Sequence, residues 1–315
     1  MVELVQGELL RNETNPRAMG GTEMVATEMH KRLPQDLLKH FQIIHSRPRQ
    51  IRDDLKKVLV LHDLHGDPEV QHLKDGGWNR YDKLVFVSNW QLQMYNAYLG
   101  VPYSKSVVIK NAINPVSVTP KDKESDKVKI IYHTTPHRGL NILYAVFEKL
   151  AQEFDFIELD VYSSFKIYGW EQRDEQYKDL FEKLKEHPQI NYHGTVSNDE
   201  VKKALAKAHI FAYPSTWMET SCISLMEALS AGCLCVHPNY AALPETAAAW
   251  TQMYQWTEDV SEHAGVFYNN LKYAIMRYKD SSMRDYAPQK SYTDVYYSWN
   301  RRIQEWVGIL NNLLT

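Results

Sequence analysis

Two glutamates in the second half of this 315-residue chain have the type and spacing to do chemistry together. Glu219 follows an apolar strand-like segment and a turn at Pro214–Ser215, and Glu227 lies in an apolar, helix-forming stretch that ends at Gly232. The N-terminus of such a helix presents unpaired backbone N–H groups and the positive end of the helix dipole, which suit a phosphate. A carboxylate beside it can accept hydrogen bonds from sugar hydroxyls. The segment therefore predicts a site for a ligand that carries both groups.

The helix that carries Glu227 is expected near residues 221–231. Thr220 or Ser221 is its expected N-cap, because either side chain can accept a hydrogen bond from a first-turn N–H group. The alternative to a ligand site is an incidental buried glutamate, although glutamate is rarely buried without a partner. Hydrolysis by the two carboxylates is a further alternative, but it needs them about 5–9.5 Å apart. Eight helical residues span about 12 Å, which argues against that alternative.

The spacing of the two glutamates resembles the Glu-x7-Glu signature of the retaining GT-B glycosyltransferases of family four. That family usually has Pro-Ser-x-x-Glu-Gly-Phe-Gly and then Glu-Ala-Met-Ala-x-Gly, which Pro214–Ser215 and 228–232 fit. Thr220-Ser221-Cys222 stands where Gly-Phe-Gly is common, so the chain departs from the family there. The layout and brevity of the chain also resemble compact transferases carried by marine phages and bacteria.

Further segments resemble family motifs in the same order along the chain. They are Gly20-Gly21-Thr22-Glu23, Leu59-Val60-Leu61-His62-Asp63, Val85-Phe86-Val87-Ser88 with Gln91, Val107 to Ile113, His193-Gly194 with Val196-Ser197, Ala208 to Phe211, and Tyr213-Pro214-Ser215. Each is weak alone, and their order makes the resemblance specific.

The resemblance implies an α/β fold of GT-B architecture, in which two Rossmann-like domains face a cleft and the N-terminal one is shortened. We expect an acceptor-side domain at 1–115, a linker at 114–127 rich in Pro, Ser and charge, and a nucleotide-sugar-binding domain at 128–292. The C-terminal helix 293–315 is expected to pack back on the first domain.

The hydrophobic pattern independently predicts alternating strands and helices, which is typical of parallel α/β domains. The expected strands lie near 2–9, 41–46, 58–62, 84–88, 106–110, 128–133, 157–162, 190–193, 209–213 and 233–237. The expected helices lie near 21–33, 68–76, 89–99, 139–152, 173–186, 198–207, 221–231 and 293–313, and Ser197-x-x-Glu200 predicts a capping box.

The resemblance also assigns catalytic roles. Glu219 is implied to lie beside the transferred sugar, and His62 to reach toward the reacting centre. Arg138 stands where the family has the Lys that neutralises the departing diphosphate. His133 stands where the family has an Arg, and it would be a second cation if protonated. Lys166 is another candidate for that second cation.

The remaining donor contacts are carried over in the same way. Glu227 is implied to accept from ribose hydroxyls, and Gly20 and Gly21 to let the backbone approach the donor. Tyr162 and Ser163 end a strand and are expected to line the base pocket. The loop residues Thr220, Ser221, Cys222 and Ile223 are expected to contact the donor.

The activity implied is transfer of a sugar from a UDP- or GDP-sugar to a glycan or lipid-linked acceptor, with no cofactor. No Asp-x-Asp occurs in the chain, so we expect no metal, although His62, Asp63, His65 and Asp67 are an alternative metal-binding group. The alternatives in function are a sugar-nucleotide epimerase of GT-B fold and a catalytically inactive sugar-nucleotide-binding protein. The base, the sugar, the acceptor and the oligomeric state stay open.

The composition is that of a globular protein, with a net charge of −3 that argues against nucleic acid as a partner. The three cysteines suggest a reducing compartment, and no apolar run or signal peptide stands out, so we expect a cytoplasmic location. Residues 30–57 hold eight Lys or Arg against three acids. They form either a solvated basic face or a peripheral contact with the inner face of a membrane.

Overall fold

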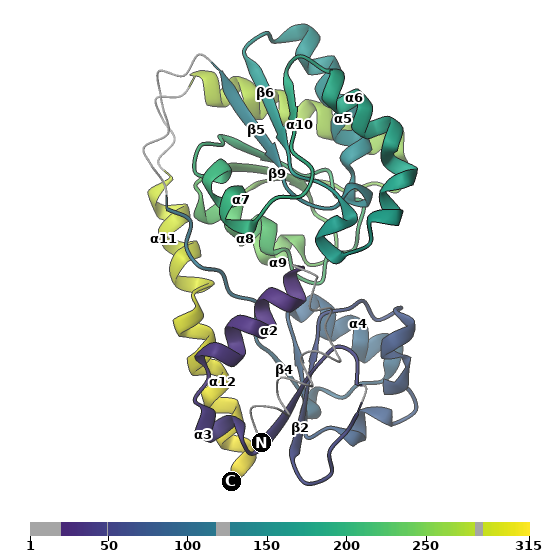
Figure 1. The fold of residues 1–315 in the computed structure, drawn as a ribbon, viewed down its shortest axis with the longest axis vertical. Helices are drawn as coiled ribbons and strands as arrows, with labels where there is room; N and C mark the ends of the chain where they lie inside the picture. The colour runs from purple at the N-terminus through teal and green to yellow at the C-terminus, as the bar shows by residue number, and fades with distance from the viewer. Residues whose placement is uncertain (1–19, 49, 118–126, 281–285) are drawn as a thin grey trace. The chain divides into compact units, whose positions relative to one another are not determined.

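The computed structural model describes residues 20–48, 50–117, 127–280 and 286–315 (Figure 1). The chain divides into two compact units. Unit 1 is Met1–Ala112 with Tyr297–Thr315, and unit 2 is Ile113–Tyr296. Each unit contains a parallel sheet with helices, which confirms the expected α/β fold class with two Rossmann-like domains. The strand expected at 2–9 and most of the expected linker lie outside the described residues.

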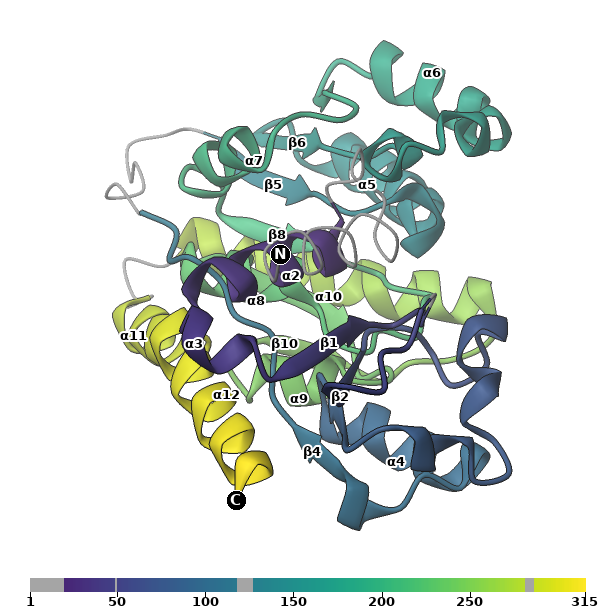
Figure 2. The same ribbon diagram turned by 60° about the horizontal axis from the view of Figure 1, so that its bottom comes forward.

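The sheet of unit 1 is parallel, with the strands side by side in chain order. Its strands are β1 (Phe41–His45), β2 (Lys56–Leu61), β3 (Lys83–Phe86) and β4 (Ser106–Val108). Its helices are α2 (Gly21–Arg32), α3 (Gln35–Leu38), α4 (Asn89–Leu99) and α12 (Trp299–Leu314), with 3-10 turns η1 (Pro68–Leu73), η2 (Gly77–Arg80) and η3 (Tyr103–Lys105). Figure 2 shows α4 beside β4, and α4 packs on β3 and β4.

A cap fixes the start of α4, as the sequence indicates. The Ser88 hydroxyl accepts from Gln91 N at 3.0 Å, and Gln91 Oε1 accepts from Val87 N at 3.0 Å. The side-chain amide of Gln91 then donates to the carbonyls of Leu61 and Asp63. This buried glutamine therefore joins α4 to the end of β2, where His62 lies.

The sheet of unit 2 is parallel throughout, in the order β10-β9-β8-β5-β6-β7. Its strands are β5 (Val128–Tyr132), β6 (Ile157–Val161), β7 (Ile190–Tyr192), β8 (Ile210–Ala212), β9 (Leu234–Pro238) and β10 (Gln252–Tyr254). The order of the strands reverses after β7, because β8 returns to the other side of β5. That reversal is the place where open α/β sheets bind their ligands.

Helices connect these strands and continue beyond the last one. They are α5 (Leu140–Glu153), α6 (Lys178–Glu186), α7 (Asn198–Leu205), α8 (Ile223–Ser230), α9 (Leu243–Ala247), α10 (Val260–Asp280) and α11 (Ala287–Tyr296), with 3-10 turns η4 (Pro136–Arg138), η5 (Phe165–Tyr168) and η6 (Glu171–Tyr177). Helix α10 packs against α5 and the sheet, while α8 packs against β9, α7 and α11. The capping box of Ser197 and Glu200 at the start of α7 is confirmed.

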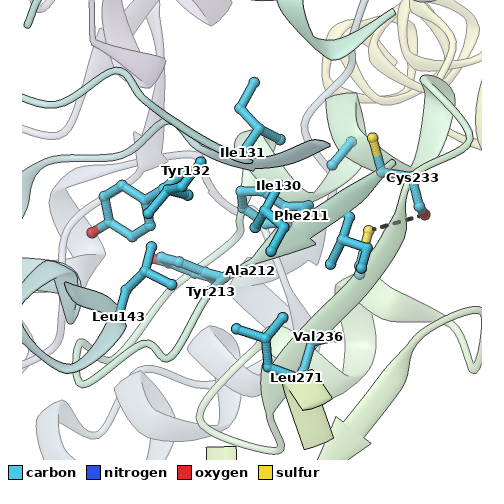
Figure 3. Close-up of a cluster of buried hydrophobic side chains, with 14 of the residues drawn as sticks. Ile130, Ile131, Tyr132, Leu143, Phe211, Ala212, Tyr213, Cys233, Val236 and Leu271 are labelled. Atoms are coloured by element: carbon cyan, nitrogen blue, oxygen red, sulfur yellow. Dashed lines mark hydrogen bonds between the residues drawn. The ribbon is translucent and has the colours of Figure 1, made fainter. Parts of the chain in front are cut away.

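The core of unit 2 lies around its central strands (Figure 3). Side chains of β5, β8 and β9 meet there with Leu143 of α5 and Leu271 of α10, all of them buried. Cys233 and Cys235 are buried in this core, and neither forms a disulfide. No helix in the described parts of the chain is long and apolar enough to cross a membrane.

Four expected element bounds are wrong in detail. The helix expected over 293–313 is interrupted, because residues 293–296 belong to α11 in unit 2 and α12 begins at Trp299 in unit 1. The segment 173–186 is a 3-10 turn, η6, followed by a shorter helix, α6. The helix expected over 68–76 is the 3-10 turn η1. Val116, expected in a linker, is buried in the unit 2 core, and its N–H donates to Ser230 Oγ at 2.9 Å. The apolar side chain of Val116 explains this, because it gains more from burial than from exposure.

Helix α11 is joined to the end of α8 by the contacts of Asp294 and Lys290 with Ser230 and by a buried glutamine. Gln289 is 3 % exposed, and its side-chain amide donates to the carbonyls of Leu229 and Cys233, both at 3.0 Å. Leu229 O also accepts from Gly232 N, and Cys233 O from the Cys235 thiol, so Gln289 adds a second, stronger donor to each of these two buried carbonyls.

Gln289→Leu should therefore destabilise the protein although it adds apolar surface. Each hydrogen bond lost contributes about 0.5–1.5 kcal/mol, so we expect the free energy of unfolding in urea to fall by roughly 1–3 kcal/mol. The control is Gln176→Leu, because the exposed side chain of Gln176 donates to one carbonyl, that of Arg173. Equal stability of the two variants would contradict the anchoring role of Gln289.

Candidate functional site

The loops that follow β5, β6 and β8 carry the predicted site residues of unit 2. These strands are neighbours in a parallel sheet, so their carboxyl ends lie at the same edge. Gly139, which follows Arg138, has a φ of +103° and lies against the loop after β8. A Cβ at Gly139 would stand 2.1 Å from Pro214 O, so glycine is needed for this close approach. The approach brings Arg138 to the loop that carries Glu219.

Glu219 is the centre of the site in unit 2. Its side chain is 5 % exposed, and its Oε1 accepts from Arg138 Nη1 and from the hydroxyl of Tyr213. Arg138 Nε donates to Thr135 Oγ1 at 3.2 Å, which orients the guanidinium. The structure thus brings together Arg138 and Glu219, two residues that the sequence predicts for the site.

The surroundings of this cluster fix the protonation states of Arg138 and Tyr213. Burial alone would lower the pKa of Arg138, but the carboxylate of Glu219 raises that pKa well above its ordinary value. Burial, and next the charge of Glu219, raise the pKa of Tyr213, so its phenol stays protonated and donates. The cluster therefore holds one fixed cation, one carboxylate and one hydroxyl donor. Tyr213 was not predicted as a site residue, although it stands directly before Pro214.

Glu227 lies on α8 and has a separate set of partners. Its Oε1 accepts from Asn198 Nδ2 at 3.3 Å and lies 3.8 Å from Lys202 Nζ. Burial raises the pKa of Glu227, while Lys202 and Asn198 oppose that rise. Asn198 and Lys202 stand four residues apart on α7, the helical spacing that places both on one face. The sequence analysis missed both, because neither lies in a recognised motif.

The start of α8 differs from the expected one. Its N-cap is Cys222, and no side chain of the described residues caps it, so the prediction of Thr220 or Ser221 as N-cap is wrong. The buried Ser221 Oγ has no hydrogen-bond partner in the described part of the chain. An uncapped helix start leaves its first N–H groups to water or to a ligand. Ile223, the first helical residue, belongs to that start.

His133 follows β5 and lies beside the start of α8. The hydroxyl of Ser224 donates to His133 O at 3.4 Å, and His133 Nε2 is buried with no hydrogen-bond partner among the described residues. Burial lowers the pKa of His133 to about 3, so the ring is neutral near pH 7. Without a ligand His133 is therefore no cation, and its role as a second cation beside a diphosphate stays a prediction. As a neutral ring, His133 still offers one N–H to a ligand.

Lys166 lies away from the buried cluster. Its ammonium is 3.3 Å from Glu171 Oε1, and both side chains are 65 % exposed. The structure therefore does not pair Lys166 with Glu219 or Glu227, and its role as a cation for the ligand stays a prediction.

Tyr162 and Ser163 stand after β6, as expected. The Tyr162 ring stacks on His193 with 4.3 Å between centroids and 7° between planes, and burial raises the pKa of Tyr162 to about 12. Ser163 Oγ is buried without a partner in the described chain, and so is Thr195 Oγ1 on the loop after β7. Thr195 was missed, because a lone threonine after a glycine carries no signal of its own.

In unit 1, the predicted residues lie at the start of α2 and the end of β2. Gly20 is the N-cap of α2 and Gly21 its first residue. His62 Nε2 lies 3.4 Å from His45 Nδ1, and the two rings stack at 5.6 Å between centroids. Burial lowers the pKa of His62 to about 4, so this histidine is neutral near pH 7. His45, which the sequence analysis missed, therefore lies beside one ring nitrogen of His62.

The basic residues of 30–57 are mostly paired with acids inside unit 1. Carboxylates lie within 4.0 Å of Lys31, Arg32, Lys39, Arg47, Arg52 and Lys57. Such surface pairs reduce the local excess of positive charge. Contact of this segment with a membrane stays a prediction. No group of three or more His, Cys, Asp or Glu in the described residues is arranged to hold a metal ion.

Residues 116–257 match the family of glycosyl transferases group 1. The match runs from Val116 through β10 and includes Arg138, Glu219 and Glu227. A search of the curated proteins finds no match.

Solved structures of glycosyltransferases share the fold. A glycosyltransferase from Rickettsia africae has a TM-score of 0.68 at 16 % identity, over 94 % of this chain and 81 % of its own. The pneumococcal O-GlcNAc transferase GtfA has a TM-score of 0.63 at 12 % identity, over 94 % of this chain and 60 % of its own. The catalytic domain of starch synthase IV from Arabidopsis thaliana has a TM-score of 0.62 at 11 % identity, over 93 % and 76 %. This chain is thus shorter than each of them.

The Arg138–Glu219 pair makes a testable contribution to the stability of unit 2. Removing one partner of a buried pair costs about 3–5 kcal/mol, because the other charge stays buried alone. Arg138→Met should lower the free energy of unfolding in urea by nearly that amount. Glu219→Gln should lower it less, because the Arg138 side chain that stays behind is 20 % exposed and keeps some contact with water. The double variant should lose less than the sum of the two.

The control pair is Lys185 and Glu182, whose charged atoms lie 2.8 Å apart on the surface of the same unit. Lys185→Met should cost under about 1 kcal/mol. Additive losses at Arg138 and Glu219 would show that the two residues do not act as a pair.

Proposed function

We propose that this protein is a retaining glycosyltransferase that uses a nucleoside diphosphate sugar. The observation that carries the proposal is the cluster of Arg138, Glu219 and Tyr213 beside the uncapped start of α8. This cluster lies within the segment that matches the glycosyl transferase family. The match and the neighbouring structures support glycosyl transfer as the class of reaction.

The first N–H groups of α8 and the guanidinium of Arg138 would bind the diphosphate. Ser221 and His133 have buried polar atoms without partners among the described residues, so a phosphate could pair with both at no further desolvation cost. Glu227 would accept from the ribose hydroxyls, held in place by Asn198 and Lys202. The orphaned hydroxyls of Ser163 and Thr195 are suited to the nucleoside.

The chemical step follows from these placements. The bond between the anomeric carbon and the phosphate oxygen breaks, and a bond from that carbon to the acceptor oxygen forms on the same face. The acceptor proton passes to the departing phosphate oxygen. Arg138 and the α8 dipole stabilise the charge that develops on the phosphate. Glu219 faces the sugar and stabilises the positive charge at its anomeric carbon. Positively charged protein groups would take the role of a metal, so we propose a metal-independent reaction.

The neighbouring structures indicate which donors to try first. The Staphylococcus aureus TarM variant and pneumococcal GtfA were solved with UDP, HepE of Anabaena with UDP-glucose, and starch synthase IV with ADP. We therefore propose UDP-sugars as the first donors, with GDP- and ADP-sugars as the alternatives, and a glycan or lipid-linked acceptor.

The test is a thermal-shift panel of UDP, GDP, ADP and their sugars, followed by turnover. A ligand at 100 times its Kd adds roughly 2.7 kcal/mol of stability, so one nucleotide should raise Tm clearly above the others. Release of that nucleoside diphosphate from its sugar should continue in excess EDTA. Binding without turnover would favour an inactive binding protein, conversion of the sugar without transfer would favour an epimerase, and loss in EDTA with rescue by Mn²⁺ would contradict metal independence.

The two glutamates should fail in different ways. Glu227→Gln should raise the donor KM more than it lowers kcat, because a ribose contact serves ground state and transition state alike. Glu219→Gln should lower kcat by a larger factor than it lowers the affinity for the free nucleotide. Charge at the anomeric carbon develops only in the transition state. Both variants are measured with the free nucleotide and with its sugar. If Glu219→Gln lowered the affinity for the free nucleotide and for its sugar equally, Glu219 would contact the nucleotide instead of the sugar.

A further inference from the structure

An aromatic surface borders the Arg138–Glu219 pair. Trp217 stands two residues before Glu219, is 40 % exposed, and has its ring 6.0 Å from the guanidinium carbon of Arg138. Its ring meets that of His137 at 85°, with 4.8 Å between centroids. His137 in turn stacks on Phe165 at 5.1 Å and 17°. We call Trp217, His137 and Phe165 the aromatic platform.

The aromatic platform is uncharged at neutral pH and carries an unused polar atom. Burial, together with Arg138 and Arg173, lowers the pKa of His137 to about 4. His137 Nδ1 is buried and has no hydrogen-bond partner in the described chain. The loops of the aromatic platform are also joined directly, since Thr216 Oγ1 donates to His137 O at 3.3 Å. The surface is therefore built and held in place without a ligand.

Two arginines border the aromatic platform, Arg138 at Trp217 and Arg173 at Phe165. The guanidinium carbon of Arg173 lies 5.9 Å from the Phe165 ring and 4.4 Å from that of Trp170, which contacts Tyr168 at 5.2 Å. Arg173 is exposed. Phe165 is buried and supports His137, so a ligand on the aromatic platform meets mainly the exposed ring of Trp217, with the N–H donors of Arg173 at its edge.

A sugar ring has the complementary chemistry. One face of a pyranose is a set of weakly positive C–H groups, which attract the negative face of an aromatic ring, and its edge carries hydroxyls that need donors and acceptors. A hydrocarbon chain would instead remove the exposed guanidinium of Arg173 from water without offering it a partner.

The exposure of the neighbouring side chains favours a position for this sugar on the solvent side of the donor sugar. Side-chain exposure rises from 5 % at Glu219 through 20 % at Arg138 to 40 % at Trp217. A ring on Trp217 therefore lies nearer the solvent than a group that contacts Glu219.

We propose that the aromatic platform binds a saccharide acceptor, with Trp217 as the main stacking residue. The inference rests on the proposed function and narrows its acceptor to a glycan rather than a lipid. The unit 2 residues thereby contribute to acceptor choice as well as to donor binding.

The test measures saccharide binding directly, without turnover. Maltose, cellobiose and chitobiose are added at millimolar concentration with UDP present, and saturation-transfer NMR records contact with aromatic protons. At least one disaccharide should bind the wild type, and Trp217→Ala should weaken its affinity about tenfold, the equivalent of the roughly 1.4 kcal/mol of a good aromatic contact. Trp217→Phe should lie between them. The loss of saccharide affinity should exceed any loss of UDP affinity.

Trp250→Ala is the matched control, because Trp250 is 36 % exposed in the same unit and contacts Tyr292 at 5.7 Å. It should bind the disaccharide as the wild type does. The proposal is overturned if no disaccharide binds the wild type, or if Trp217→Ala and Trp250→Ala behave alike. Because binding is measured, a protein that binds the disaccharide through Trp217 yet turns over no nucleotide sugar would contradict the proposed function alone.

Discussion

Burial of the Glu219 carboxylate is the constraint on which the unit 2 site depends. A carboxylate that is 5 % exposed needs partners, and the structure supplies them from two separate loops, with Arg138 after β5 and Tyr213 at the end of β8. These partners can meet only because β5 and β8 are neighbours and because Gly139 allows its loop to touch Pro214. The sheet order and one glycine thus position the chemistry.

The same sheet gives the two glutamates separate sets of partners. Glu219 precedes α8 and is bound from the loops, whereas Glu227 lies within α8 and is bound from α7 through Asn198 and Lys202. Each carboxylate is balanced by its own cation, so neither depends on the other for its charge. Helix α8 itself is held from its far end by Gln289 and by the contact of Ser230 with Asp294. Its N-terminus is thereby kept at a fixed place beside His133.

Much of this fold follows from local patterns in the sequence. The alternation of apolar strands and helices, and the capping box of Ser197 and Glu200, depend on residues a few positions apart, so the sequence predicts them. The resemblance likewise indicates Glu219, Glu227 and Arg138. The predicted start of α8 was wrong. Thr220 and Ser221 are good N-caps in isolation, but the loop that carries Glu219 places Cys222 at the N-cap position.

The features of the site that the sequence does not predict come from contacts between distant segments. The charge of His133 depends on burial, which no local pattern reports, and the partners of Glu227 lie 25 and 29 residues before it in the chain. The aromatic platform is assembled from three loops, so Trp217, His137 and Phe165 carry no common signal in the sequence.

The pairing of Arg138 with Glu219 also bears on whether this arginine can serve a ligand. Its Nη1 donates to Glu219 and its Nε to Thr135, and none of the contacts that the structure describes for it uses Nη2. A guanidinium donates from a rigid plane, so fixing two of its nitrogens also fixes the direction of the third. The contact with Glu219 therefore leaves Nη2 available to a ligand and fixes the direction in which it donates. A phosphate bound to Nη2 would then lie at a set distance from the Glu219 carboxylate, which is the arrangement that the proposed transfer requires.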